Sequence, residues 1–449
     1  MLPNLSPVRH EERNYSKSYI TVTKKFWISH AFALIWTAFS IYLSVPWLDS
    51  LSSVVPWIAA LLIIGGIAYI PGYMNAFLLS SLLLDRQPKY KNERPADRVT
   101  VLIAAYNEEK GIFNTLRYVA GQDYSSRLKV IVIDNDSTDS TTEEVLRAKE
   151  ELRLDIQLLK EKRKGKFHAL NKGLRHVRTP YLITLDADTL LHPSAIRYMV
   201  ARLQSSPDDV CAVAGSMLVR NSRESIWTRI QEWEYFLGIA SVKRLQGLYQ
   251  GTLVAQGAFS LYKTSYIREI QGWPDAIGED IVLTWRLLGK GWKVYFEPLA
   301  AAFTDTPVTL RQLIRQRSRW ARGMIEGLKE IKPWKQPQIY TKYLTGINFV
   351  MPYLDVVYTF FWIPGLILAL FGIFWIVGPM TLFVLPLTLV SYGLLYRYQK
   401  RYVFENLQLH IRKNKLGFLL YILFYQMIMS PVSVLGYMQE LFQLKRVWK

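Results

Sequence analysis

Gln316, Arg319 and Trp320 lie close together in a Gln-x-x-Arg-Trp segment, and their types point to ligand binding. The first supplies an amide, the second a fixed cationic fork and the third an aromatic face. An arginine fork binds carboxylate or phosphate groups in a bidentate geometry, and an aromatic face can stack on a ring or a cation. A long apolar run starts soon afterwards, at Leu344. We therefore expect these side chains to hold an anionic, sugar-containing ligand near a membrane.

Two carboxylates, Asp186 and Asp188, follow the apolar run from Tyr181 to Leu185. Side chains at i and i+2 of an extended chain face the same side, so their charges would lie close together. A hard divalent cation that also contacts diphosphate oxygens would neutralise them. A charged turn at the end of a strand is the structural alternative. Because the pair ends a strand of a nucleotide-type pattern, we favour the metal site.

A second acidic pair, Glu279 and Asp280, lies at the start of an expected helix. The helix dipole favours carboxylates at this position, which is a sufficient structural explanation. The functional interpretation is a general base that removes the proton from an acceptor hydroxyl as it attacks.

Two other positions have a structural and a functional interpretation. Asp134 could accept a hydrogen bond from a uracil N–H, or it could cap the next helix or close an Asx-turn; the residue alone leaves both open. Gly165 and Lys166 lie in a lysine-rich segment before a helix start, where a diphosphate could bind. Taken alone, this segment is more simply a solvated loop.

The middle of the chain has the pattern of an α/β domain that could position these residues. Short β-branched apolar runs alternate with helical segments, which is typical of βαβ units. In such folds ligands bind at the carboxyl ends of the strands. The expected strands cover residues 99–105, 128–133, 156–159, 181–185, 212–220, 254–261 and 292–298, and the expected helices start near 110 and 141 and cover 226–245 and 309–330.

Apolar runs on both sides of this domain are long enough to be membrane spans. They cover residues 26–48, 55–84, 344–395 and 416–442. The third run is too long for one helix and is interpreted as two spans broken near Gly378 and Pro379, so we expect about five spans. Basic residues before Phe26 place the N-terminus in the cytoplasm, and after two spans the middle of the chain is cytoplasmic as well.

These boundaries predict five parts. They are a cytoplasmic N-terminal segment (1–25), two transmembrane helices (26–87), a cytosolic domain (88–306), amphipathic interface helices with the Gln-x-x-Arg-Trp segment (307–343) and a C-terminal transmembrane region of about three spans (344–449).

The formal net charge of +19 does not by itself indicate a nucleic-acid partner, and we expect none. Lys and Arg collect on the cytoplasmic faces of membrane proteins, where they also attract anionic lipid. A basic chain also favours a nucleotide-activated substrate. The single cysteine, Cys211, excludes an intramolecular disulfide and a thiolate metal cluster.

The order of these motifs resembles the processive family 2 glycosyltransferases, which include cellulose, chitin, hyaluronan and poly-N-acetylglucosamine synthases. The matching residues are Asp134, Asp186, Asp188, Glu279, Asp280, Gln316, Arg319 and Trp320. Within the family, the chain is most similar to the bacterial poly-β-1,6-N-acetylglucosamine synthases, in residues 165–171, 185–189 and 231–235. It departs from the usual pattern at Asn135, where Asp is usual, at Gly278, where Thr is usual, and at 322–324, where small residues are usual.

The resemblance implies a nucleotide-diphospho-sugar transferase fold of the α/β GT-A type, joined to an α-helical transmembrane region. It also implies a role for each residue. For the donor, Ala105, Tyr106 and Glu108 would flank the uridine, Asp134 would bind the uracil, and Lys166 and Asp186 would contact the nucleotide. Asp188 would ligate Mg²⁺ or Mn²⁺, and Asp280 with Glu279 beside it would supply the catalytic base. Gln316, Arg319 and Trp320 would hold the diphosphate and the acceptor end.

The activity implied by the resemblance is inverting, processive synthesis of a β-linked polysaccharide from a UDP-sugar, foremost UDP-N-acetylglucosamine, with export through the protein's own spans. The implied setting is the inner membrane, with the catalytic domain in the cytoplasm. The implied partners are the UDP-sugar, the growing polysaccharide and membrane lipid, and family analogy also allows a small accessory membrane subunit. The alternatives are a hyaluronan-, chitooligosaccharide- or glucan-type synthase, a non-processive transferase to a lipid carrier, and a membrane scaffold or transporter without catalysis.

Overall fold

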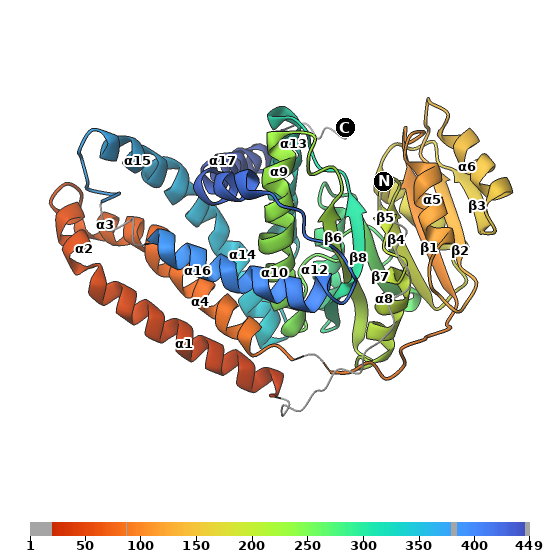
Figure 1. The fold of residues 1–449 in the computed structure, drawn as a ribbon, viewed down its shortest axis with the longest axis horizontal. Coiled ribbons are helices and arrows are strands. Elements are labelled where there is room, and N and C mark those ends of the chain that lie inside the picture. Colours follow the sequence, from red (N-terminus) through yellow and green to blue (C-terminus); the bar gives the residue numbers. More distant parts are fainter. Residues whose placement is uncertain (1–19, 87, 379–383, 445–449) are drawn as a thin grey trace.

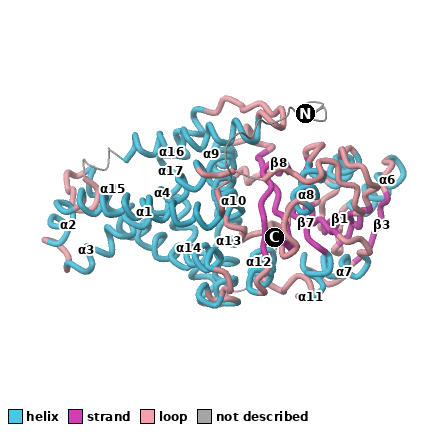
Figure 2. The backbone as a smooth tube through the Cα atoms, turned by 90° about the horizontal axis from the view of Figure 1, so that it is seen from below, coloured by secondary structure: helices cyan, strands magenta, loops and turns pink. Residues whose placement is uncertain are grey.

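The computed structural model describes residues 20–86, 88–378 and 384–444. The molecule is elongated, with the strands gathered towards one end and the long apolar helices towards the other (Figure 1). A view at right angles shows the same separation of strands and helices (Figure 2). The two parts meet along α9 (Ile226–Trp233), α10 (Ala240–Leu248) and α13 (Leu310–Glu330).

An eight-stranded sheet forms the core of the strand-containing part, in the order β3-β2-β1-β4-β7-β6-β8-β5. The first four strands in this order are parallel, whereas β7 runs antiparallel to both β4 and β6. The strands are β1 (Val99–Ala105), β2 (Lys129–Asp134), β3 (Asp155–Lys160), β4 (Tyr181–Asp186), β5 (Leu190–Leu191), β6 (Val210–Val219), β7 (Phe259–Lys263) and β8 (Lys293–Thr304). This mixed α/β sheet confirms the predicted fold class and six of the seven predicted strands to within a few residues, except that β8 extends beyond its predicted end.

Helices cover both faces of the sheet because the alternating residues of β1 enter two different cores. Val101 and Ile103 pack into the core that contains Leu116 of α5, whereas Leu102 packs into the core that contains Leu170 of α7. This two-sided burial explains why β1 is a continuous apolar run. The helices around the sheet are α5 (Ile112–Ala120), α6 (Thr141–Glu151), α7 (Lys166–His176), α8 (Ala195–Gln204), α11 (Thr264–Glu269) and α12 (Glu279–Gly289).

The strand predicted at 254–261 is wrong in its first half, because only Phe259–Lys263 joins the sheet. The backbone N–H groups of Ala255 and Gly257 donate to side chains of α12 instead, at 2.9 Å to Thr284 Oγ1 and 3.2 Å to Asp280 Oδ2. The segment is therefore a loop held against α12. The predicted helix at 226–245 is present as α9 and α10, joined by a π-helical segment.

Four helices within the described residues are long and apolar enough to cross a membrane. They are α1 (Val22–Leu43), which is followed by the short α2 (Val45–Ser52); the run of α3 (Trp57–Ile64), a π-helical turn and α4 (Ile70–Leu83); the run of α14 (Ile339–Val357), another π-helical turn and α15 (Ile363–Leu370); and α17 (Lys415–Leu441). The expectation of about five spans is therefore wrong for the described part of the chain, which has four candidates.

The expected span that is not among the four corresponds to α16 (Val384–Gln399). This helix has 16 residues and continues into a π-helical turn that begins with Lys400 and Arg401. A bilayer core requires about 20 predominantly apolar residues. The described part of α16 is shorter than this and directly follows residues 379–383, which lie outside the described ranges.

The break between α15 and α16 begins earlier than predicted. Helix α15 ends at Leu370, before Gly378, while Pro379 lies outside the described residues. In the last apolar run, α17 continues through Pro431 without interruption.

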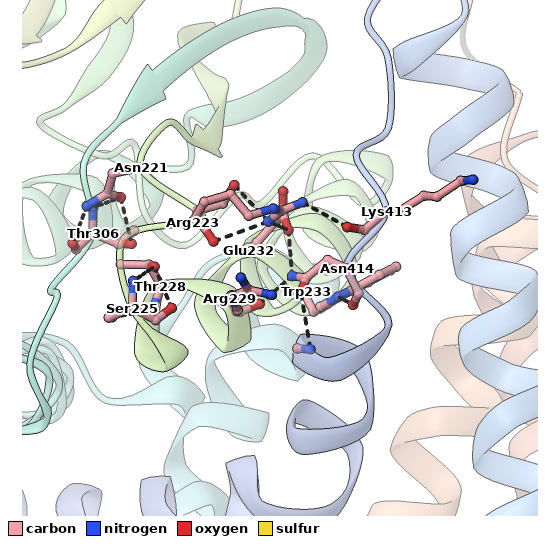
Figure 3. Close-up of polar contacts among 12 residues, drawn as sticks. Asn221, Arg223, Ser225, Thr228, Arg229, Glu232, Trp233, Thr306, Lys413 and Asn414 are labelled. Atoms are coloured by element: carbon pink, nitrogen blue, oxygen red, sulfur yellow. Dashed lines mark hydrogen bonds and ion pairs between the residues drawn. The ribbon is translucent and has the colours of Figure 1, made fainter.

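The segment before α17 is attached to α9 by a group of polar contacts (Figure 3). Asn414 donates to Glu232 at 2.6 Å and to the carbonyl of Arg229 at 2.8 Å, and its own carbonyl accepts from Trp233 Nε1 at 2.9 Å. Arg223 completes the group by donating to Glu232 at 2.8 Å. These contacts fix the entry of a candidate membrane helix relative to the sheet domain.

Helix α13 packs between α12 and α17, and glycines allow close approach on both sides. A Cβ atom added at Gly323 would lie 2.8 Å from the Cα of Gly278, which immediately precedes α12. On the other side, a Cβ atom added at Gly436 of α17 would meet the carbonyl of Ser318 and would lie 2.7 Å from the Cβ of Ala321. The departures from the family pattern at Gly278 and Gly323 are thus two sides of one backbone contact.

The Gly323→Val substitution should push α13 away from α12. Overpacking at such a contact costs about 1–3 kcal/mol, so we expect a lower thermal unfolding midpoint in detergent. Gly346→Ala is the matched control, since nothing lies within 4 Å of a Cβ atom at that position. Equal midpoints for the two variants would show that the α12–α13 contact is looser than described.

Candidate active site at the carboxyl edge of the sheet

Ala105, Asp134 and Asp186 end three adjacent parallel strands, so the fold brings them to one edge. In the strand register Ala105 pairs with Asp134, and Ala104 pairs with Asp186. Tyr106 follows directly and is partly buried. The carboxyl edge of a parallel sheet is the usual position of a ligand in such folds.

Asp134 holds the segment between β2 and α6, and this segment is joined to the loop after β1. The two carboxylate oxygens of Asp134 accept from the backbone N–H of Ser137 at 3.0 Å and from Thr142 Oγ1 at 2.8 Å. Glu108, in the loop after β1, donates its backbone N–H to Thr141 Oγ1 at 2.8 Å. Asp134 therefore has a structural role in the turn before α6, although its bond reaches the third following residue, rather than the second as in an Asx-turn, and the N-cap of α6 is Ser140. Each carboxylate oxygen has a second lone pair, so contact with a ligand N–H remains compatible with these bonds.

Asn135 positions the lysine-rich loop, and this role of Asn135 was not recognised from the sequence. Its amide nitrogen donates to the carbonyls of Glu161 at 3.0 Å and Arg163 at 2.7 Å, and its amide oxygen accepts from the backbone N–H of Gly165 at 2.9 Å. Gly165 has a φ of 134°, which an L-residue rarely adopts. A carboxylate could accept but could not donate, which gives a physical reason for the departure at Asn135.

Lys166 begins α7 and links two of the acidic groups. Its ammonium lies 2.5 Å from Asp186 Oδ1 and 3.6 Å from Glu279 Oε1. Burial opposes the charge on Lys166, but the two carboxylates outweigh it and raise the pKa of the ammonium. The group therefore stays cationic beside the helix N-terminus, where an anionic ligand is favoured.

Asp188 has the electrostatic character of a cation ligand. Burial, followed by the charges of Asp186 and Glu108, raises the pKa of Asp188 to about 6. A divalent cation would relieve this repulsion. No group of three or more His, Cys, Asp or Glu side chains within the described residues could hold a metal ion by itself. The residues thus fit a cation that takes part of its coordination from ligand oxygens.

The acidic pair at the start of α12 has two different environments. Burial raises the pKa of Glu279 to about 7, with Lys166 opposing and Asp280 adding to the effect. Asp280 instead has its carboxylate oxygens bound by two backbone N–H groups, from Gly257 at 3.2 Å and Ile281 at 2.9 Å. Asp280 is therefore the oriented member of the pair.

The Gln-x-x-Arg-Trp segment lies on α13, and its three predicted residues differ in their partners. Gln316 accepts from Arg317 at 3.0 Å. Trp320 is 39% exposed, and the Arg317 guanidinium lies 3.9 Å from its ring centre. Arg319 makes no ion pair with any residue in the described ranges, so its charge is available to a ligand.

Arg317 is a second residue that sequence reasoning missed. It is buried and pairs with Glu234 at 2.5 Å. Its spacing from Trp320 was visible in the sequence, but Glu234 is distant in the chain and only the fold reveals the pair. Arg317, fixed by its ion pair with Glu234, packs against the Trp320 ring and helps to hold it in position.

The fold brings the predicted residues into two groups. Ala105, Tyr106, Glu108 and Asp134 gather around β1 and β2, whereas Lys166, Asp186, Asp188, Glu279 and Asp280 gather around β4 and the start of α12. Helix α13 with Gln316, Arg319 and Trp320 contacts α12 through Gly323. The helix that carries the Gln-x-x-Arg-Trp segment therefore packs against the helix that begins with Glu279 and Asp280.

This fold, with carboxylates and a lysine at the carboxyl edge of the sheet, defines a glycosyltransferase of the GT-A fold class. The chain belongs to glycosyltransferase family 2: the model described as glycosyltransferase like family 2 matches residues 95–323, which confirms the family expected from the motifs.

Two relatives named poly-beta-1,6-N-acetyl-D-glucosamine synthase are similar to the matched part of the chain. The protein from Staphylococcus aureus (strain COL) is 35% identical over 246 residues, which cover 55% of this chain and 58% of the relative. The protein from Staphylococcus epidermidis is 32% identical over 264 residues, which cover 58% of this chain and 63% of the relative. The similarity thus spans a little over half the length of each relative.

A solved structure supports the fold over a larger part of the chain. It is a mannosyltransferase from Pyrobaculum calidifontis in complex with GDP-Man and Mn²⁺, with a TM-score of 0.57 and 20% identity, and the match covers 86% of this chain and 99% of that chain. At this identity the likeness concerns the fold alone.

The Asn135→Asp substitution tests the loop support. It should place a carboxylate against two carbonyl oxygens and leave the loop unsatisfied, at a cost of about 1–3 kcal/mol. We expect weaker UDP binding by calorimetry, because Lys166 follows this loop directly. Asp136→Asn is the control, since Asp136 is exposed, with a φ of 64° that Asn tolerates. Unchanged UDP affinity in Asn135→Asp would separate this loop from the nucleotide site.

Proposed function

We propose that the chain is a membrane-bound, inverting, processive hexosyltransferase that extends a β-linked polysaccharide from a UDP-sugar and exports it through its own spans. UDP-N-acetylglucosamine is the donor, because the relatives at 32% and 35% identity are named for that polymer. The catalytic part faces the cytoplasm, and the four apolar helices anchor the chain in the cell membrane.

One observation carries the proposal. The Gln-x-x-Arg-Trp helix packs by backbone contact against the helix that begins with Glu279 and Asp280. The first helix carries an exposed aromatic ring and an arginine that makes no ion pair among the described residues, and the second carries an oriented carboxylate. Transfer of a sugar from a nucleoside diphosphate to the end of a sugar chain requires this combination: a cation for the diphosphate, a ring for the acceptor sugar and a base for its hydroxyl.

The donor lies along the carboxyl edge. Ala105, Tyr106 and Glu108 flank the uridine, and Asp134 accepts the uracil N–H. Lys166, already paired with Asp186, faces the nucleotide. Arg319 neutralises the diphosphate, which an arginine fork can bind in a bidentate geometry.

Asp188 would hold Mg²⁺ or Mn²⁺ together with diphosphate oxygens. A cation there would supply charge stabilisation to the departing UDP. The raised pKa of Asp188 and the absence of a three-ligand group in the described residues support this shared coordination.

Asp280 acts as the general base. It takes the proton of the acceptor hydroxyl while that oxygen forms a bond to the anomeric carbon of the donor. The bond from the same carbon to the UDP oxygen breaks, and its electron pair leaves with UDP. Attack opposite to the leaving group converts an α-linked donor into a β-linked product. Glu279 stays 3.6 Å from the Lys166 ammonium, and its negative charge helps to keep that group protonated.

Trp320 stacks on the acceptor sugar, and Gln316 lies one turn before it on α13. Arg317 covers part of the ring and is held by Glu234, so the ring is oriented before the sugar arrives. From this position the growing chain advances, sugar by sugar, into the membrane part. Membrane lipid and, by family analogy, a small accessory subunit are the partners of that part.

Incubating the purified full chain with Mg²⁺ or Mn²⁺ and a panel of UDP-sugars tests the proposal. The expected result is a polymer formed from UDP-N-acetylglucosamine and degraded by a β-1,6-N-acetylglucosaminidase. A polymer from another UDP-sugar would assign a hyaluronan-, chitin- or glucan-type synthase, and transfer of single sugars to lipid would remove processivity.

Asp280→Asn should reduce polymer formation by about 10²–10⁴-fold, because the amide cannot accept the proton. UDP affinity, measured by calorimetry, should stay near that of the wild type. Asp275→Asn, an exposed substitution in the preceding loop, is the control. Near-normal synthesis by Asp280→Asn would reject the base assignment.

Trp320→Ala should reduce elongation more than hydrolysis of the UDP-sugar. Loss of an aromatic stacking contact costs about 1–1.5 kcal/mol, roughly a tenfold slower elongation rate. Chain length on gels and released UDP measure the two activities. Trp334→Ala removes another exposed tryptophan, 61% exposed, as a control. An equal loss of both activities would make Trp320 a packing residue.

A further inference from the structure

Lys243 of α10 is a mostly buried amine that the proposed mechanism does not use. Burial lowers its pKa to about 8, and the charge of Asp280 acts in the opposite direction. A buried ammonium requires hydrogen-bond acceptors, and the structure supplies two. These are the carbonyl of Val254 at 2.9 Å and the side-chain oxygen of Gln256.

Both acceptors belong to the 254–257 loop, the segment that was predicted to be a strand. Gln256 also donates to the carbonyl of Gly215 in β6 at 2.6 Å, and the backbone N–H of Ala255 donates to Thr284 of α12. The loop is therefore held by side chains of α10 and α12, by a backbone carbonyl of β6, and by Tyr262 and Ser260 of β7, whose hydroxyls donate to the carbonyls of Ala255 and Gln256 at 2.8 Å each. Lys243 supplies the contact that reaches both Val254 and Gln256.

Gly257, at the end of this loop, lies beside the proposed base Asp280 and also beside the pair of Lys166 and Glu279. The backbone N–H of Gly257 donates to Asp280 Oδ2 at 3.2 Å. A Cβ atom added at Gly257 would lie 2.8 Å from the Lys166 ammonium and 3.6 Å from Glu279 Oε1. Of the two N–H groups on the Asp280 carboxylate, that of Ile281 belongs to α12 itself, so Gly257 supplies the one that depends on the loop.

We infer that Lys243 is a positioning residue for glycosyl transfer: it holds the 254–257 loop so that the Gly257 N–H aims the Asp280 carboxylate at the acceptor hydroxyl. The inference rests on the proposed role of Asp280 as the base. Lys243 does not touch the reacting atoms. It acts through a short path that runs from its ammonium to Val254 and Gln256, and from the Gly257 N–H to Asp280.

The charge of Lys243 gives this role a distinctive pH dependence. The charged and titratable groups around the loop are Asp280 and Glu279 from α12, Lys166 from α7 and Tyr262 from β7, and of these Asp280 acts on the charge of Lys243. Burial raises the pKa of Tyr262, so its hydroxyl keeps its proton near pH 8. Lys243 is cationic below about pH 8 and loses its proton as the pH rises through that value. Its hydrogen bonds to the loop then become weaker, since charged donors bind more strongly than neutral ones.

The test compares Lys243→Met and Lys243→Arg in the full-length chain. Misplacement of a reacting group by about 1 Å can lower the rate by 10²-fold, so Lys243→Met should lower kcat by about 10–100-fold with little change in UDP affinity. Lys243→Arg should recover part of kcat. The wild-type rate should fall above about pH 8, whereas the rate of Lys243→Arg should not, because a guanidinium remains charged. Lys263→Met is the matched control; that amine binds the carbonyl of Asp208.

Hydrogen exchange of peptides that cover residues 254–257 gives a readout that needs no substrate. Exchange should be faster in Lys243→Met than in the wild type and in Lys263→Met. Wild-type kcat in Lys243→Met, an unchanged exchange rate, or the same alkaline fall in Lys243→Arg would overturn the inference. If Lys243→Met does not fold, the pH profile of Lys243→Arg decides. If the wild type transfers no sugar from any UDP donor, the proposed function fails, while the exchange measurement still decides whether Lys243 holds the loop.

Discussion

The backbone contact between Gly278 and Gly323 is the constraint on which the arrangement of the site depends. It allows α12 and α13 to approach closely enough for an acidic pair and an aromatic residue to share one region. Helix α13 has a second close contact on its other side, at Gly436 of α17. The Gln-x-x-Arg-Trp helix therefore packs on one side against a candidate membrane helix and on the other against the helix that begins with Glu279 and Asp280.

Electrostatics around the site follows a common rule: most buried charges have a partner, and the partners come from different elements. Lys166 lies between Asp186 and Glu279, and Arg317 pairs with Glu234. Breaking such a buried pair is costly because it leaves one charge without compensation. The pairs therefore hold the elements in register before any ligand arrives. Asp188 differs from these pairs, because burial and the charges of Asp186 and Glu108 raise its pKa despite the opposing charge of Lys166.

The sequence predicts those parts of the fold that depend on local pattern. Strand β1 is apolar on both faces, and Asp186 ends β4 as expected from its apolar run. The 254–257 loop was missed because its apolar residues suit a strand, whereas its hydrogen bonds go to distant side chains. Arg317 was missed for the same reason, since Glu234 meets it only after folding. The described residues contain four candidate spans rather than five, because the described part of α16 has 16 residues and directly follows residues 379–383, which lie outside the described ranges.

The attachment of Asn414 to α9 has a consequence for the biosynthesis of the protein. Chains fold from the N-terminus as they are made, so the sheet can form early. The contacts of α9 with Asn414 and of α13 with Gly436, however, require residues that are synthesised much later. The Gln-x-x-Arg-Trp helix can reach its final position only after α17 has emerged and packed. A ribosome-bound chain would thus carry an incomplete candidate site until the last described helix is in place.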